Sequence, residues 1–224
     1  MNGGLFVVAT PIGNLEDITL RALRTLRECD AVVAEDSRRT ASLLRAHGIE
    51  RRVLSLPAHD EERRVPGLVS RLDAGETLAL CTDAGTPGIS DPGAVLVRAA
   101  RGRGHRVVPV PGPSAVVTAL SASGLAGSGF CFLGFLPRTP GRLARALGEA
   151  VHTGRVLAFY ESPLRLARTL RLAGDVLGDR EVVVARELTK LHETFHVGTA
   201  AALADEFTVS PPRGECTVLV GGAA

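Results

Sequence analysis

The sequence predicts an α/β protein built from two domains. Short apolar runs of strand length alternate with segments of helical spacing along the whole chain. This alternation restarts after Ser121–Gly129, a run of almost entirely small residues that suits a linker. With 224 residues and 45% hydrophobic content, the chain has enough apolar material for two cores. We therefore expect an N-terminal α/β domain at 1–118 and a C-terminal α/β domain at 119–224.

The first half predicts a parallel sheet with helices on its faces. Its apolar runs predict strands at Leu5–Ala9, Ala31–Ala34, Val53–Leu56, Thr77–Cys81 and His105–Pro109. Between them, spacing and caps predict helices at Glu16–Glu28, Arg39–Ala46 and Ala94–Arg101. A further helix is expected after Glu61 and should end at about Leu72. Because strands and helices alternate at short intervals, the strands should run parallel.

The second half predicts a mixed sheet. Strands are expected at Phe130–Phe135, Arg155–Tyr160, Glu181–Ala185, Glu193–Val197 and Cys216–Val220. Helices are expected at Arg142–Val151, Leu164–Ala173 and 199–205. A connection as short as Leu191-His192 predicts antiparallel pairing, because parallel strands need a longer crossover. We expect a cleft between the two domains, hinged near residues 116–129.

One loop, residues 81–93, has the composition of a ligand site. It follows the strand Thr77–Cys81, precedes a helix, and contains glycines, prolines, small hydroxyl residues and two aspartates, Asp83 and Asp91. Glycine lets a ligand approach the backbone, and carboxylates accept hydrogen bonds from hydroxyl or amine groups. Parallel topology would bring Asp36, Asp60, Asp83 and Asp91 to one edge of the sheet. The alternative is an ordinary connection rich in glycine and proline.

Bulk composition narrows the setting and the chemistry. The net charge is +2 and aromatic residues make up 4%, so neither charge nor stacking surface demands a nucleic-acid partner. The four cysteines form no C-x-x-C pair and the histidines are scattered, so no metal site is expected. No signal segment or membrane-length apolar run is visible, which favours a reducing, cytoplasmic setting. Lys190 is the single lysine beside twenty-five arginines, and arginine cannot deprotonate to act as a base.

Eight short motifs then carry a family resemblance over residues 5–221. They are Thr10-Pro-Ile-Gly-Asn14, Ala34-Glu-Asp-Ser-Arg38, the loop from Asp83 to Gly93, Pro111-Gly-Pro-Ser-Ala115, Phe132-Leu-Gly-Phe-Leu-Pro137, Tyr160-Glu-Ser-Pro163, Ala185-Arg-Glu-Leu-Thr-Lys190 and Arg213-Gly-Glu215. In this order they resemble the ribosomal branch of the tetrapyrrole methylase family. His59-Asp60-Glu61 resembles a further short motif of that family, without an assigned role.

The resemblance implies a class III methyltransferase fold that binds S-adenosyl-L-methionine in the interdomain cleft. The implied reaction is methylation of the 2′-hydroxyl of a cytidine in the decoding region of 16S rRNA. The absence of a G-x-G-x-x-G motif after a strand agrees with a fold other than the Rossmann type. The implied partners are 16S rRNA or the small ribosomal subunit and a second copy of the chain as a homodimer, with no membrane.

The same resemblance assigns cofactor contacts to fifteen positions. These are Pro11, Asp83, Ala84, Gly85, Thr86, Pro87, Ser90, Asp91, Ser114, Ala115, Tyr160, Glu161, Arg186, Gly214 and Glu215. For Tyr160, a half-buried core ring with a satisfied hydroxyl is an equal alternative.

Catalytic and RNA-binding candidates follow from the chemistry that this reaction needs. A base for the ribose hydroxyl would help, and a desolvated lysine near other cations can have its pKa lowered enough to act. Lys190 is the candidate base, with Glu187, Glu35 and Asp36 as alternatives or orienting groups; binding a phosphate or forming a surface ion pair is the competing role for the lysine. Candidates for phosphate binding are the adjacent pairs Arg38, Arg39, Arg63 and Arg64, for which a solvated surface is the alternative.

Two departures from the family pattern bear on the substrate. Tetrapyrrole-methylating members have Gly-Gly-Asp-Pro where this chain has Ala84-Gly-Thr-Pro87, which favours the ribosomal branch. Relatives usually continue beyond the position of Ala224 as a helical segment that faces RNA, so this departure bears on RNA affinity or on how the substrate is held. The alternatives are carbon methylation of a tetrapyrrole in corrin or sirohaem synthesis and a non-catalytic module that binds S-adenosylmethionine.

Overall fold

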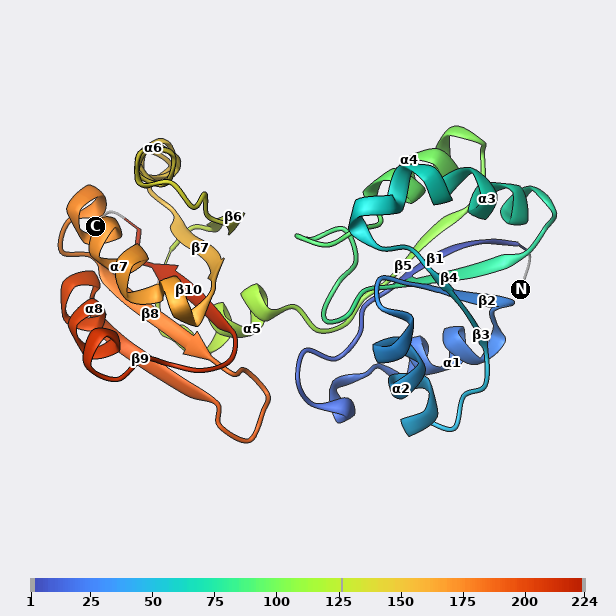
Figure 1. Cartoon of the computed structure of the whole chain (residues 1–224), viewed down its shortest axis with the longest axis horizontal. Helices are drawn as coiled ribbons and strands as arrows, with labels where there is room; N and C mark the ends of the chain where they lie inside the picture. Colours follow the sequence, from blue (N-terminus) through green and yellow to red (C-terminus); the bar gives the residue numbers. More distant parts are fainter. Residues whose placement is uncertain (1–2, 126, 223–224) are drawn as a thin grey trace. The chain divides into compact units, whose positions relative to one another are not determined.

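A computed structural model describes residues 3–125 and 127–222 (Figure 1). The chain divides into two compact units, Met1–Ser114 and Ala115–Ala224. Each unit has its own sheet and its own hydrophobic core, which confirms the predicted α/β class with one parallel and one mixed sheet.

The sheet of the first unit is parallel throughout. Its strands are β1 (Gly4–Val8), β2 (Ala31–Ala34), β3 (Arg52–Ser55), β4 (Thr77–Cys81) and β5 (Val107–Val110), in the order β3-β2-β4-β1-β5. Every pair of neighbouring strands is parallel, as predicted. The helical segments are η1 (Leu15–Asp17), α1 (Leu20–Glu28), α2 (Ser37–Ala46), η2 (Ala58–Asp60), α3 (Glu61–Asp73) and α4 (Ala94–Gly102).

Helices cover both faces of this sheet. Leu78 and Leu80 of β4 point into a core shared with α3 and α4, whereas Ala79 and Cys81 point into a core shared with α1 and α2. Figure 1 shows these two pairs of helices on opposite sides of the strands. All residues of β4 are therefore buried, which explains why the strand appears in the sequence as a continuous apolar run.

The second unit contains a mixed sheet. Its strands are β6 (Phe130–Phe135), β7 (Val156–Glu161), β8 (Glu181–Arg186), β9 (Thr194–Thr199) and β10 (Cys216–Val220), in the order β6-β7-β10-β8-β9. β6 and β7 are parallel and the other neighbours are antiparallel. The antiparallel β8–β9 pairing predicted from the short connection is confirmed.

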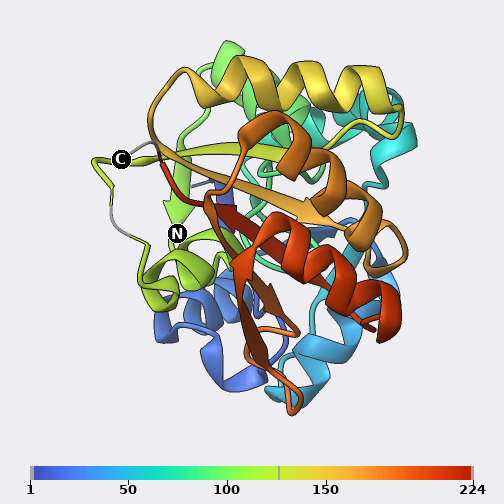
Figure 2. The same cartoon turned by 90° about the vertical axis from the view of Figure 1, so that its left-hand side faces the viewer.

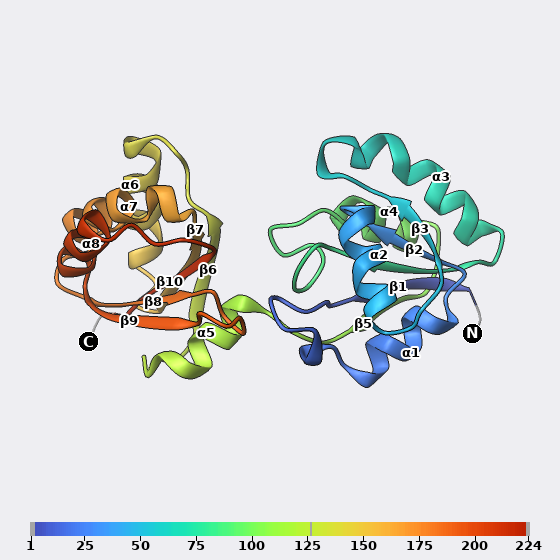
Figure 3. The ribbon, with the colours of Figure 1, turned by 60° about the horizontal axis from the view of Figure 1, so that its bottom comes forward.

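Three helices cover one face of the second sheet. They are α6 (Pro140–Val151), α7 (Pro163–Leu177) and α8 (Ala200–Val209), and Figure 2 shows them lying across the strands. Phe159 is the largest fully buried side chain and packs in their shared core. A fourth helix, α5 (Ala115–Ser123), packs against β10 and β8, away from this layer (Figure 3).

The structure corrects the sequence prediction at several places. Helix α5 was missed, because its small apolar residues have no amphipathic period, and the linker expected at Ser121–Gly129 begins inside it. One residue of that expected linker, 126, lies outside the described residues. The helix predicted at Glu16–Glu28 is split into η1 and α1, since the Thr19 side chain accepts a hydrogen bond from Ala22 N and starts a new helix. Among the described residues, no helix is both long and apolar enough to cross a bilayer.

Candidate active site

The loops that follow β1, β4 and β5, at the carboxyl edge of the first sheet, are joined by hydrogen bonds, and we call them the fastened loops. Thr10 after β1 and Gly85 after β4 exchange two backbone hydrogen bonds, of 2.9 and 3.1 Å. The buried Thr10 hydroxyl donates to the carbonyl of Thr82 at 3.1 Å. The Thr86 hydroxyl donates to the carbonyl of Pro113, after β5, at 3.2 Å. The predicted cofactor loops after β1, β4 and β5 therefore form one connected surface.

A group of carboxylates lies on this edge, and we call Glu35, Asp83 and Asp91 the carboxylate cluster. Asp83 joins the β4 loop to the β2 loop, because its Oδ1 accepts from the backbone N–H of Asp36 at 3.0 Å. Burial, followed by the charge of Asp83, raises the pKa of Glu35 above its ordinary value. Burial, followed by the charges of Glu35 and Asp83, raises the pKa of Asp91 to about 6. The cluster therefore concentrates negative charge that a cationic or hydroxyl-bearing ligand would relieve.

Asp36 and Asp60 have local structural partners. Asp36 caps α2, accepting from the backbone N–H of Arg38 at 2.8 Å, and this bond lowers the pKa of Asp36. Asp60 accepts from Arg63 at 2.6 Å and from Arg64 at 2.7 Å, and these bonds hold the pKa of Asp60 well below its usual range. The expected approach of Asp36 to Asp83 is present, whereas Asp60 bonds to its own helix.

Each of the four arginines predicted to bind RNA has a nearby carboxylate. Arg38 lies 3.8 Å from Asp36, and Arg39 lies 3.5 Å from Asp83. Arg63 and Arg64 share Asp60. Their positive charges are therefore partly compensated within the first unit, which weakens the field that they offer to a phosphate.

Glu61 holds the far end of the β4 loop. Its Oε1 accepts from the backbone N–H groups of Gly93 at 2.9 Å, Val95 at 3.1 Å and Leu96 at 3.4 Å, which are the first free donors of α4. In the sequence, Glu61 stands out only as part of the short motif His59-Asp60-Glu61, which has no assigned role. Its partners are more than thirty residues away in sequence, so no local signal indicates the contact.

Close packing at Gly93 and strain at Ser90 shape the same loop. Gly93 has φ of 130°, and a Cβ there would lie 2.8 Å from Leu80 Cδ2. Ser90 adopts φ of 65°, a left-handed conformation that is unfavourable for a residue with a Cβ. Such conformations persist where the surroundings hold them in place, often at ligand sites.

In the second unit, Arg186 fixes the β8–β9 hairpin. Its guanidinium donates to the Thr194 hydroxyl at 3.1 Å, the Arg213 carbonyl at 3.0 Å and the His192 carbonyl at 3.1 Å. The hairpin is also strained, because Glu187 has φ of 52° and Thr189 has φ of 65°. Arg186, predicted as a cofactor contact, thus orders the loop that contains Lys190.

Lys190 lies between two carboxylates. Its Nζ donates to Glu187 Oε1 at 2.8 Å and to Glu215 Oε2 at 2.9 Å. Burial alone would lower the pKa of Lys190, but the bonds to Glu187 and Glu215 outweigh burial and raise it. The bond from Lys190 lowers the pKa of Glu187. Gly214 is required beside this group, since a Cβ there would overlap the Glu187 carboxylate.

This surrounding differs from the one on which the base role was predicted. That role requires a lysine pKa lowered by nearby cations, and the carboxylates have the opposite effect. The base role stays a prediction, and the geometry gives Lys190 the properties of a fixed cation instead.

Tyr160 and Glu161 face opposite sides of β7. The Tyr160 ring packs against Phe132, with ring centroids 5.0 Å apart, and against Phe135 at 5.4 Å. The Glu161 side chain is 1% exposed and accepts from Thr169 at 2.6 Å and Arg165 at 3.0 Å. Glu161, predicted as a cofactor contact, has its carboxylate directed into the helical layer of its own unit.

The predicted site residues therefore fall into two groups. The first unit brings together, on its fastened loops, Pro11, Asp83, Ala84, Gly85, Thr86, Pro87, Ser90, Asp91 and Ser114, with Glu35 and Asp36 beside them. The second unit brings together Arg186, Glu187, Lys190, Gly214 and Glu215. Ala115 begins α5. Within the described ranges, no three His, Cys, Asp or Glu side chains gather as metal ligands would.

The first unit has a parallel sheet with a Gly/Pro-rich loop after β4, and the second unit has a mixed sheet. This combination is that of a methylase of the tetrapyrrole type. The chain belongs to the family described as Tetrapyrrole (Corrin/Porphyrin) Methylases, whose sequence profile matches residues 4–204. This finding confirms the family predicted from the eight motifs.

Among curated proteins, the chain is similar to several named Ribosomal RNA small subunit methyltransferase I. The protein from Thermotoga maritima is 46% identical over 98% of this chain and 99% of its own length. The Pseudomonas aeruginosa protein is 49% identical over 98% of this chain and 79% of its own length. The Escherichia coli O157:H7 protein is 46% identical over 98% of this chain and 78% of its own length.

Solved structures share the fold at low sequence identity. The methyltransferase CobJ has a TM-score of 0.74 at 21% identity, covering 99% of this chain and 95% of its own. Uroporphyrin-III C-methyl transferase from Thermus thermophilus, complexed with S-adenosylhomocysteine, has a TM-score of 0.68 at 17% identity, covering 98% and 97%. At these identities the likeness concerns the fold alone.

Proposed function

We propose that this protein transfers a methyl group from S-adenosylmethionine to the 2′-hydroxyl of a cytidine in the decoding region of 16S rRNA. The observation that carries the proposal is identity of 46% and 49% over 98% of the chain with ribosomal RNA small subunit methyltransferases I. Coverage of 98% means that the match extends over both units.

The first unit offers groups that fit the cofactor. S-adenosylmethionine supplies a methyl group on a sulfonium, and it has ribose hydroxyls and an ammonium group as donors. The carboxylate cluster supplies acceptors for such donors, and the raised pKa values of Glu35 and Asp91 support a positively charged ligand beside them. Asp83, Ser90 and Asp91 would hold the cofactor on the fastened loops, which the paired backbone groups of Thr10 and Gly85 keep in place.

The second unit supplies a fixed positive charge. Lys190 is held as an ammonium by Glu187 and Glu215 on a strained hairpin that Arg186 orders. Two of the three N–H donors of the ammonium are bound to these carboxylates, and the third can orient a ribose oxygen of the substrate at low entropic cost. We assign Lys190 this positioning role, with Glu187 and Glu215 keeping it protonated.

A transfer assay tests the proposal. The protein is incubated with S-adenosylmethionine labelled in its methyl group and with undermethylated small subunits, naked 16S rRNA or a tetrapyrrole. We expect label in a ribose of the RNA. Label in the tetrapyrrole would replace this proposal by carbon methylation, and cofactor binding without transfer to any substrate would indicate a non-catalytic module.

Cellular setting and assembly follow from the same proposal. An enzyme that acts on ribosomal RNA works in the cytoplasm, and we propose that setting here. We also propose a homodimer, which sedimentation of the purified protein would test; a single species at the 23.4 kDa monomer mass would contradict the dimer.

A further inference from the structure

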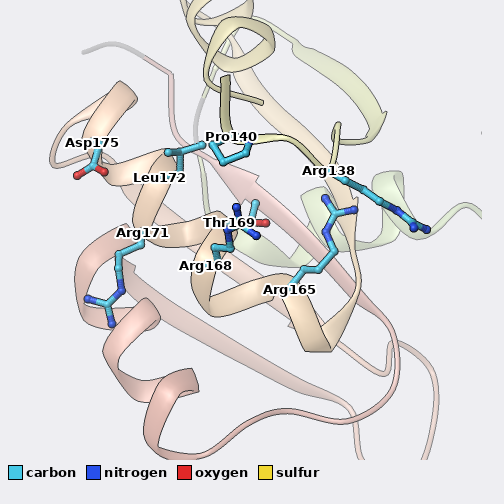
Figure 4. Close-up of a pocket in the computed structure, with 8 residues that line it drawn as sticks. All are labelled: Arg138, Pro140, Arg165, Arg168, Thr169, Arg171, Leu172 and Asp175. Carbon is cyan, nitrogen blue, oxygen red and sulfur yellow. The ribbon is translucent and has the colours of Figure 1, made fainter. Parts of the chain in front are cut away.

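A depression of about 470 Å³ lies between the start of α6 and one side of α7 in the second unit (Figure 4). Four arginines line it, Arg138, Arg165, Arg168 and Arg171, and we call this group the arginine depression. Its one acidic lining residue is Asp175. The site lies apart from the Lys190 hairpin and contains none of the residues predicted to bind RNA.

The regular spacing of α7 produces this surface. Arg165, Arg168 and Arg171 recur at intervals of three, which places them about 4.5 Å apart along the helix axis and on neighbouring positions of one side. The residues on the other side, Leu166 and Leu170, are fully buried in the core of the unit. The helix is therefore held by its apolar side and presents its arginines outward as a row.

Arg165 forms the fixed part of the depression. Its Nη2 donates to Glu161 Oε2 and to the Leu136 carbonyl, both at 3.0 Å. Glu161 is almost fully buried and also accepts from Thr169, so the guanidinium has a rigid anchor. The remaining N–H donors of Arg165 stay available, because a guanidinium has five.

Arg138 and Arg168 are the uncompensated charges. Both are exposed, and among the described residues neither guanidinium forms an ion pair or a hydrogen bond. Arg171 pairs with Asp205 at 3.0 Å, but both side chains are more than half exposed, so water and salt weaken that pair. In contrast, Arg63 and Arg64 of the first unit are tightly bound to Asp60.

We propose that the arginine depression binds the phosphate backbone of the RNA substrate. The inference rests on the proposed function and adds to it a docking surface on the second unit. Arginine suits this role because its planar donors match phosphate oxygens, and a row of such contacts fixes the position of an RNA without reading its sequence. Six of the eight lining residues are polar or charged, with Leu172 and Pro140 as the apolar members, and four arginines against one aspartate favour a polyanion such as a phosphate chain as the occupant.

The test removes the two uncompensated charges together. The variant Arg138→Gln/Arg168→Gln is compared with a matched control, Arg24→Gln/Arg98→Gln. The control removes two exposed arginines of the first unit that likewise form no ion pair among the described residues. Binding of naked small-subunit RNA is measured at several salt concentrations. We expect the first variant to bind RNA about tenfold more weakly. The slope of the logarithm of its binding constant against the logarithm of salt concentration should also become shallower by about one to two. Both effects should be much smaller in the control.

Three further readouts separate the possible failures. S-adenosylhomocysteine binding and urea unfolding should be unchanged in both variants, which excludes misfolding as the cause. Equal RNA affinity and salt slope in variant and control would overturn the docking surface while leaving methyl transfer by the wild-type protein intact. A loss seen with intact subunits but not with naked RNA would also overturn it, since the occupant would then be a ribosomal protein. Arginine-dependent RNA binding by a wild-type protein that transfers no methyl group would support the surface and contradict the proposed function.

Discussion

The ammonium group of Lys190 shows how much the neighbours of a residue decide its chemistry. A single lysine among many arginines is a natural candidate for a base. However, the hydrogen bonds to Glu187 and Glu215 raise the pKa of Lys190 and keep it protonated. A protonated lysine acts through charge and hydrogen bonds, which arginine can partly imitate.

The first prediction separates charge from proton transfer at Lys190. We expect Lys190→Arg to retain a measurable part of the methyl-transfer rate and Lys190→Met to lose at least about tenfold more, because only arginine keeps a cation there. Single-turnover rates at saturating RNA measure this difference. Equal and near-complete loss in both variants, with an unchanged dissociation constant for RNA, would instead support the base role.

The second prediction concerns Asp91, whose folded-state pKa of about 6 exceeds its ordinary value of 3.8. The folded state then binds more protons than the unfolded state between about pH 4 and 6, so the free energy of unfolding falls as pH rises through that window. Asn has no charge to bury, so we expect Asp91→Asn to be more stable than the wild-type protein at pH 7, by up to about 1–2 kcal/mol after allowance for solvent screening.

Urea unfolding at pH 4 and pH 7 measures this effect. The gain of Asp91→Asn should shrink towards zero at pH 4, where the wild-type carboxyl is largely protonated. Asp179→Asn, at an exposed position after α7, is the matched control and should show no such gain. An Asp91→Asn protein that is less stable at pH 7 than at pH 4, relative to wild type, would contradict the sign.

At the scale of elements, the β4 loop and helix α4 are held by a side chain from another helix. Glu61, at the start of α3, accepts from three N–H groups at the start of α4. Because Gly93 provides no side-chain cap, the carboxylate of Glu61 replaces one and also interacts favourably with the helix dipole.

The third prediction follows from that cap. We expect Glu61→Ala to lower the free energy of unfolding by about 1–2 kcal/mol, since three partly buried donors lose their acceptor, and Glu61→Gln to lower it by less. Glu62→Ala, one residue further along the same turn and exposed, is the control. If urea unfolding gave the same value for Glu61→Ala and Glu62→Ala, the cap would contribute nothing to stability.

At the scale of the whole molecule, the two units have separate cores, and a ligand of the folded state should stabilise the unit that binds it. The fourth prediction is that S-adenosylhomocysteine raises the unfolding temperature, with a stabilisation of about 2.7 kcal/mol at a concentration of one hundred times its dissociation constant. Asp83→Asn should reduce the shift, because Asp83 joins the loop after β4 to the loop after β2 and carries one of the proposed cofactor acceptors. Thermal unfolding with and without ligand tests this, and an equal shift in wild type and Asp83→Asn would contradict the site.

Much of the fold could be predicted from the sequence because the strands are buried runs with clear ends. Ala31–Ala34, Thr77–Cys81, Phe130–Phe135 and Cys216–Val220 were predicted to the residue. Helix α5 was not, because its residues have no amphipathic period and resemble a linker. The candidate loops were predicted from their motifs, and their hydrogen bonds were not.

The sequence by itself therefore determined the class of fold, the family and the positions of the candidate loops, since burial and turn formation depend on residues close in the chain. Only the tertiary structure decided which side chains meet. Asp36 and Asp83 are 47 residues apart and Glu187 and Glu215 are 28 apart, yet each pair shares a hydrogen bond. A pKa or an ion pair depends on distance in space, so whether Lys190 is a base or a cation, and which arginines stay uncompensated, is set by the packing of strands that are remote in sequence.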